Sequence, residues 1–306
     1  MGCCYEIILS IFLMAGVGYL LKVVRFWGPA EGMVFSKTVL YVTLPCFILL
    51  ALAGAKLTKE AFIVPIIFFI SSFLLGLIGY FIARLLALPR SSTGTFILAI
   101  SLANTGFLGY PVIQGVLGNK ALAWAAIIDQ FGMALPLNTL GIAIATYYGK
   151  SESEQNRFLT LLKSPPFIAS IVALPLIGKS IPSYLHPLWR SMEFLRNATV
   201  PLIMLFLGIS LRPSNFKSNW LPLTIATLLK IFLHPLLVYF LAIPIGLSLL
   251  PLKVLIMQAC MPTALMTVVF SEQFKLDLEL ASGIVFLTTL SSIFTIPFMS
   301  QVLSAR

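Results

Sequence analysis

Long apolar stretches recur along the whole chain and alternate with short polar segments. We count ten of them, and most reach the roughly 20 apolar residues that a helix needs to cross a bilayer. The expected spans are 5–24, 33–53, 61–88, 91–119, 121–148, 165–177, 192–211, 220–243, 251–272 and 280–303. A β-barrel strand would be about 10 residues long and would alternate in polarity. The pattern therefore predicts an all-α membrane protein with ten transmembrane helices.

The fourth span has an unusual centre. Residues 104–111 read Asn-Thr-Gly-Phe-Leu-Gly-Tyr-Pro inside an otherwise uncharged apolar run. Glycine and proline weaken a helix, and a freed polar backbone inside a membrane must be buried in protein or line a wet cavity. We interpret this octapeptide as a broken helix with a binding site at the break.

The prolines suggest an internal repeat. Pro45 and Pro111 lie in the second and fourth spans, and Pro201 and Pro262 lie at a similar spacing in the seventh and ninth. Because each half has five spans, the second half must be inverted relative to the first, as in many secondary transporters. We expect two inverted five-helix repeats at 1–148 and 164–306, joined by a cytoplasmic loop at 149–163.

Composition supports membrane insertion and excludes other classes. The chain is 59% hydrophobic and 10% charged, and its mean hydropathy is +1.02, whereas soluble domains carry about 25% charged residues. The net charge of +10 comes from single basic residues at span ends, which fits lipid headgroups rather than nucleic acid. A slight excess of Lys and Arg on one side favours both termini outside a plasma membrane. No metal motif, cofactor motif or enzyme signature is visible, so we do not expect an enzyme.

Paired breaks offer a way to bind an anion. A half-helix N-terminus presents free amides and a positive dipole end, and Asn104, Thr105 and Thr263 add side-chain donors. The alternative is a packing kink without a ligand. The predicted substrate-binding residues are Asn104, Thr105, Gly106, Gly109, Pro111, Pro262 and Thr263.

Asp129 and Lys230 are charged groups deep within spans, where a charge is costly unless it is paired or functional. Asp129 is either a proton-coupling group, a structural partner of Lys230, or close enough to the interface to be hydrated. His234 is interpreted as a hydrogen-bonded helix residue. Gln258 either faces the site or bridges helices. In the first span, Gly16 and Gly18 predict close helix packing.

The order of these motifs resembles the auxin efflux carrier family over essentially the whole chain. The resemblance rests on the octapeptide, Asp129-Gln130-Phe131-Gly132, Leu44-Pro45, Val200-Pro201 and Met261-Pro262-Thr263-Ala264. It implies a fold like that of the bile acid–sodium symporters, with a scaffold of spans one, two, six and seven. Spans three to five and eight to ten would form a moving bundle in which broken spans four and nine cross at their prolines.

The resemblance also implies the function. We expect a secondary transporter of small organic anions such as dicarboxylates, working by alternating access and favouring efflux. H⁺ coupling, Na⁺ coupling and uncoupled diffusion along the membrane potential stay open. The alternatives are a sodium-coupled symporter of the bile acid type and a membrane receptor that binds the anion without moving it. The expected partners are the anion and the lipid bilayer, with a homodimer left open.

Overall fold

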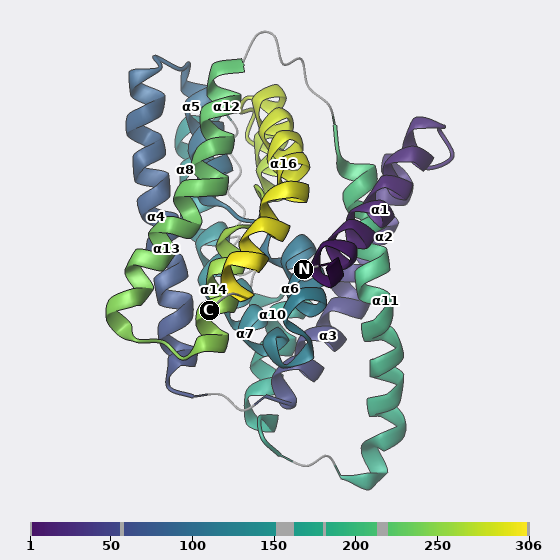
Figure 1. Cartoon of the computed structure of the whole chain (residues 1–306). Coiled ribbons are helices and arrows are strands. Elements are labelled where there is room, and N and C mark those ends of the chain that lie inside the picture. Colours follow the sequence, from purple (N-terminus) through teal and green to yellow (C-terminus); the bar gives the residue numbers. More distant parts are fainter. Residues whose placement is uncertain (1, 56–57, 151–161, 180–181, 213–219, 305–306) are drawn as a thin grey trace.

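The computed structural model describes residues 2–55, 58–150, 162–179, 182–212 and 220–304, and the regular secondary structure in these ranges is helical, apart from one isolated β-bridge (Figure 1). The helices of the first half are α1 (Gly2–Val23), α2 (Pro29–Thr38), α3 (Leu44–Ala53), α4 (Glu60–Leu85), α5 (Arg90–Ser101), α6 (Tyr110–Leu117), α7 (Leu122–Ile127) and α8 (Ile142–Tyr148). Those of the second half are α10 (Pro165–Ala173), α11 (His186–Ser210), α12 (Trp220–Leu228), α13 (His234–Ala242), α14 (Leu249–Ala259), α15 (Met266–Gln273) and α16 (Leu278–Ser304).

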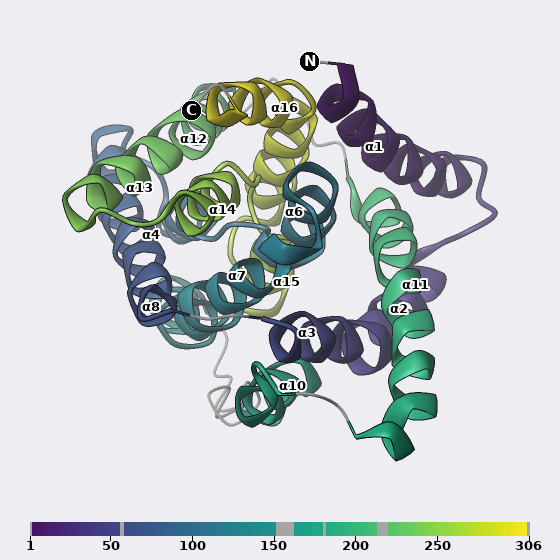
Figure 2. The ribbon, with the colours of Figure 1, turned by 60° about the horizontal axis from the view of Figure 1, so that its bottom comes forward.

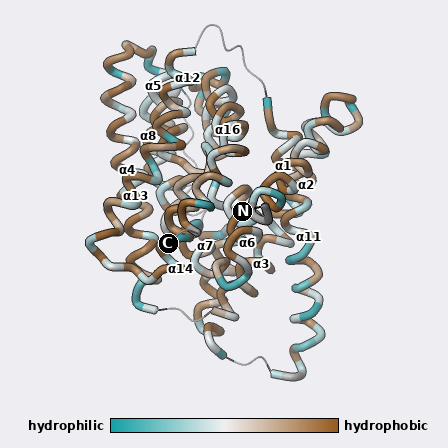
Figure 3. Tube along the Cα trace, viewed as in Figure 1, coloured by the Kyte–Doolittle hydropathy of each residue, from teal (hydrophilic) through white to brown (hydrophobic). Residues whose placement is uncertain are grey.

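Seven continuous helical segments of the described chain are long and apolar enough to cross a membrane, and apolar residues dominate their traces (Figure 3). This confirms an all-α membrane protein. Three of the ten expected spans fall outside this set. The spans at 91–119 and 251–272 are each interrupted near the middle, and the helix within 165–177 is short.

One span of the second half begins at a different residue than expected, and the loop before this half stays a prediction. The span expected at 192–211 begins earlier, because α11 starts at His186 and carries Pro187 in its first turn, where a missing amide costs nothing. Most of the expected loop at 149–163 lies outside the described residues, so its placement stays a prediction.

The helices form two groups. One contains α1, α2, α3, α10 and α11, and the other contains α4, α5, α8 and α12 to α16 (Figure 2). Helices α6 and α7 lie between them: α6 contacts α1, and α7 contacts α3. A large core of buried apolar side chains continues across both groups, and a smaller one joins α4 and α5 to α12 and α16.

Glycines set the close contact of α1 with α11. A Cβ added to Gly18 would lie 2.3 Å from the carbonyl oxygen of Leu205, and one added to Gly208 would lie 2.0 Å from that of Ala15. Gly16 has open space around it instead. The prediction of close packing is thus confirmed for Gly18 and wrong for Gly16, because only one face of α1 meets α11.

Several spans contain a π-helical turn, a feature that is frequent at functional sites. Three of these turns hold the polar positions singled out above. They are η2 (Thr105–Gly109), η4 (Ile128–Ala134), which carries Asp129, and η8 (Leu229–Leu233), which carries Lys230.

Candidate functional site at the helix crossing

Two interrupted spans meet at the centre of the molecule. The chain is not helical from Leu102 to Asn104, after α5, or from Cys260 to Leu265, after α14. Ala103 and Thr263 form an antiparallel bridge. Asn104 N donates to Pro262 O at 2.8 Å, and Ala264 N donates to Leu102 O at 3.0 Å. The two breaks therefore satisfy each other's backbone groups, as a membrane interior requires.

The positions of the two prolines differ. Pro262 lies in the crossing itself, whereas the first break precedes the octapeptide. Pro111 lies in the first turn of α6, directly after the π-helical turn η2. The expectation that the two spans cross at both prolines is therefore wrong for Pro111. Proline fits at the start of a helix without breaking it, and the first span is interrupted at Leu102–Asn104 instead.

Asn104 caps the second half of the broken span. Its Oδ1 accepts a hydrogen bond from Phe107 N at 3.2 Å, while its Nδ2 is buried and has no partner. Only 3% of the residue is exposed. A buried polar atom without a partner costs about 1–3 kcal/mol, so this amide is the best candidate in the octapeptide for contact with a ligand.

Gln258 reaches the same place from α14. Its Nε2 donates to Thr105 O at 3.4 Å, and its Oε1 is buried without a partner. Gly109 makes room for it, since a Cβ there would lie 2.2 Å from Oε1. Two alternatives for Gln258 followed from the sequence, which were to face the site or to bridge helices. Its position one turn before the Pro262 break is the signal that places it at the crossing.

The two predicted threonine donors are already used. Thr263 Oγ1 donates to Ala99 O at 2.8 Å, and its backbone amide donates to Thr288 Oγ1 at 3.2 Å. Thr105 Oγ1 donates to Asp129 at 2.5 Å. Both hydroxyls thus hold the crossing together, and neither is left over for a ligand.

Asp129 lies against the broken span. Its carboxylate accepts hydrogen bonds from Thr105 Oγ1, from Tyr110 Oη at 2.9 Å and from Gln130 Nε2 at 2.7 Å. Gly106 lets the carboxylate approach, because a Cβ there would lie 3.3 Å from Oδ1. Three donors satisfy an ionised carboxylate, which only accepts hydrogen bonds. The roles of Tyr110 and Gln130 were missed, although both residues belong to motifs singled out in the sequence.

Lys230 has other partners than Asp129. Its Nζ donates to Ile100 O at 3.1 Å and lies 3.4 Å from His234 Nδ1, while His234 Nε2 lies 3.3 Å from Ser71 Oγ. The structure therefore does not bring Asp129 and Lys230 together as an ion pair. The amino group of Lys230 lies instead at the carboxyl end of α5, where the helix dipole is negative.

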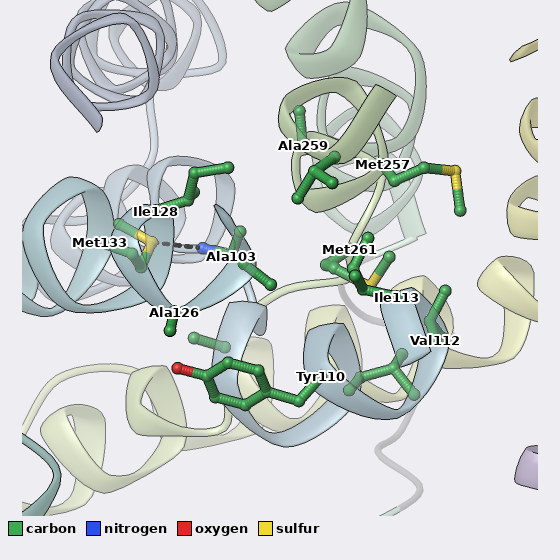
Figure 4. Packing of buried hydrophobic residues seen from close by; sticks show 14 of the residues in the cluster. Ala103, Tyr110, Val112, Ile113, Ala126, Ile128, Met133, Met257, Ala259 and Met261 are labelled. Atoms are coloured by element: carbon green, nitrogen blue, oxygen red, sulfur yellow. Dashed lines mark hydrogen bonds between the residues drawn. The ribbon is translucent and has the colours of Figure 1, made fainter. Parts of the chain in front are cut away.

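The crossing is buried in the large apolar core, which includes Ala103, Met133 and Met261. The amide of Ala103 donates to Met133 Sδ at 3.1 Å, and Figure 4 shows this bond with Tyr110 and Met261 nearby. The crossing is thus enclosed by apolar side chains, which strengthens electrostatic interactions within it.

An open pocket of about 470 Å³ lies between α6 and the helices α1 and α11. Its lining comes from Glu6 and three further residues of α1, from Pro111, Gln114 and Gly115 of α6, and from Arg196, Asn197 and Val200 of α11. Arg196 donates to Asn119 Oδ1 at 3.0 Å and lies over the Phe47 ring. The pocket therefore brings a guanidinium next to the half-helix that begins at the crossing. Within the described residues no group of His, Cys, Asp and Glu side chains could hold a metal ion.

Comparison with known proteins identifies the family. A family model described as "Membrane transport protein" matches residues 3–300. An uncharacterized transporter of Methanocaldococcus jannaschii is 28% identical and aligns over 97% of this chain and 98% of its own length. An uncharacterized transporter of Methanothermobacter thermautotrophicus is 28% identical over the same shares of the two chains. A Rhizobium meliloti protein named "Putative malonate transporter" is 26% identical over 95% of this chain and 92% of its own. This chain therefore belongs to the auxin efflux carrier family of membrane transport proteins.

Proposed function

We propose that the protein is a secondary transporter that exports small organic anions by alternating access. The observation that carries the proposal is the crossing with its unpartnered Asn104 amide. Support for the anionic class comes from the half-helix N-terminus at Asn104 and from Arg196 in the adjoining pocket. A relative named for malonate transport fits the same class.

Two inverted five-helix repeats would account for this geometry. Each expected repeat contributes one interrupted span, and the two interruptions pair in antiparallel fashion at Ala103 and Thr263. In our proposal α1, α2, α3, α10 and α11 are the scaffold, and the bundle around the crossing moves against them. The pocket fits this division, because its lining comes from α1 and α11 on one side and from α6 on the other.

We favour transport without sodium. In a sodium-coupled carrier, carbonyl oxygens freed at a helix break would hold the cation. Here the amino group of Lys230 already donates to the Ile100 carbonyl at the end of α5. An anion also leaves a negative-inside cell downhill by about 2.3 kcal/mol per charge per 100 mV, so export needs no coupling ion.

The test is flux through purified protein in liposomes loaded with radiolabelled malonate. We expect efflux above that of empty liposomes, faster with a negative-inside potential and equal in sodium and potassium salts. Sodium-dependent accumulation would instead identify the bile acid type of symporter. Malonate binding without flux would identify a receptor. Absence of both binding and flux across a panel of mono- and dicarboxylates would overturn the organic-anion proposal.

A further inference from the structure

A second, apolar groove lies on the bundle, away from the proposed substrate pocket. It has a volume of about 270 Å³ and runs between α4, α5 and the helices of the span at 121–148. Its lining includes Phe69, Phe73, Leu77 and Tyr80 of α4, together with Met133 and Tyr148. Phe73 and Leu77 are 52% and 44% exposed, so the groove opens on the side of the molecule that faces lipid.

The dimensions of the groove match one leaflet of a bilayer. From Phe69 to Tyr80 it extends about 16 Å along α4, at about 1.5 Å per residue. The hydrocarbon core of a bilayer is about 30 Å thick, so this length is close to the depth reached by one acyl chain. The groove ends at Tyr80 and Tyr148, which suit the interface between hydrocarbon and headgroups.

Positive charge gathers at the tyrosine end. Arg84, one turn after Tyr80, and Arg90, at the start of α5, are exposed and both act electrostatically on the Tyr148 phenol. Arg90 Nη2 donates to Tyr147 O at 2.5 Å, and its guanidinium lies 5.2 Å from the centre of the Tyr147 ring. This contact fixes one arginine beside the mouth of the groove, with guanidinium donors remaining for a phosphate.

We propose that this groove binds an anionic phospholipid, with one acyl chain along α4 and the headgroup phosphate at Arg84 and Arg90. With both termini outside, as the slight excess of Lys and Arg predicts, these arginines lie on the cytoplasmic side, where anionic lipids are concentrated. At its inner end the acyl chain contacts Met133, whose Sδ accepts the hydrogen bond from Ala103 in the crossing. The bound lipid therefore packs against a residue that holds the crossing.

The experiment measures lipid binding to the purified full chain by native mass spectrometry, with phosphatidylglycerol and phosphatidylcholine as probes. We expect one molecule of phosphatidylglycerol to stay tightly bound and phosphatidylcholine to bind more weakly. Arg84→Gln with Arg90→Gln should weaken the binding of phosphatidylglycerol about 25-fold, given a loss of about fivefold for each arginine near an anionic lipid, and should remove the preference for this lipid. Lys150→Gln is the control, because it removes an exposed charge outside the groove lining.

A second pair of variants tests the acyl chain. Ala143→Trp fills the groove from its exposed rim, whereas Thr146→Trp changes an exposed position of α8 outside the lining. Only the first should reduce retention of both lipids. Equal retention of the two lipids by the unaltered chain, or full retention by Ala143→Trp, would overturn the proposal. Loss of malonate binding by Ala143→Trp with lipid binding intact would assign the groove to substrate instead.

Discussion

The hydroxyl of Thr105 donates a hydrogen bond of 2.5 Å to the carboxylate of Asp129. This contact joins the π-helical turn after the crossing to the neighbouring span, and Tyr110, at the start of α6, donates a second bond to the same carboxylate. Any change in the charge of Asp129 therefore acts directly on the half-helix that Asn104 caps.

Asp129→Asn should flatten the pH dependence of transport, because the amide does not titrate between acidic and neutral pH. The NH₂ group of the new amide would also lie against one of the three hydrogen-bond donors that now contact the carboxylate. This costs about 1–3 kcal/mol of stability. The measurement is malonate efflux from liposomes across a pH series, beside thermal unfolding. Thr105→Val is the control, since it removes one donor, keeps the carboxylate and should retain the pH dependence. An Asp129→Asn variant with an unaltered pH profile would leave Asp129 a structural role.

Asn104→Asp should weaken malonate binding at least tenfold while the protein stays folded. Aspartate caps a helix about as well as asparagine, so the bond from Phe107 N survives. The free amide donor is replaced by a negative charge, and two like charges about 4 Å apart repel by several kcal/mol at the effective dielectric of a protein. Calorimetric titration measures the affinity. Asn104→Ser keeps a capping oxygen without the charge and should show a smaller loss. Unchanged affinity in Asn104→Asp would remove this residue from the site.

Gly109→Ala should disrupt the contact between the two broken spans. The new Cβ would lie 2.2 Å from Gln258 Oε1, which displaces the Gln258 amide from Thr105 O and costs about 1–3 kcal/mol of stability. Adding Gln258→Ser should restore the lost stability, because the shorter side chain leaves room for the methyl group. A double-mutant cycle of unfolding temperatures measures this coupling. Additive effects of the two changes would show that they act independently.

Gly18→Ala should destabilise the protein, whereas Gly16→Ala should be neutral or stabilising. The methyl group at Gly18 meets backbone of α11, which cannot move aside, and overpacking of this kind costs about 1–3 kcal/mol. At Gly16 the space is open, and alanine favours the helix by about 0.5–1 kcal/mol over glycine. Thermal unfolding of the two variants side by side is the measurement. Equal unfolding temperatures would contradict the close α1–α11 contact.

The sequence by itself determined the membrane class and the place of the candidate site. Apolar runs of this length exclude a soluble core, and the octapeptide at 104–111 stands out because glycine, proline and amides are costly inside a membrane. The matching break at Pro262 could also be located, because proline restricts the chain locally wherever it occurs.

Only the tertiary structure decided which polar groups meet. From the sequence, Thr105 and Thr263 are expected to be free hydrogen-bond donors. In the folded protein both hydroxyls donate to partners inside the bundle. Lys230 contacts the end of α5 rather than Asp129, and Gln258 joins the crossing. The physical reason is that residue type fixes the cost of burying a polar group, whereas its partner depends on segments far apart in the chain.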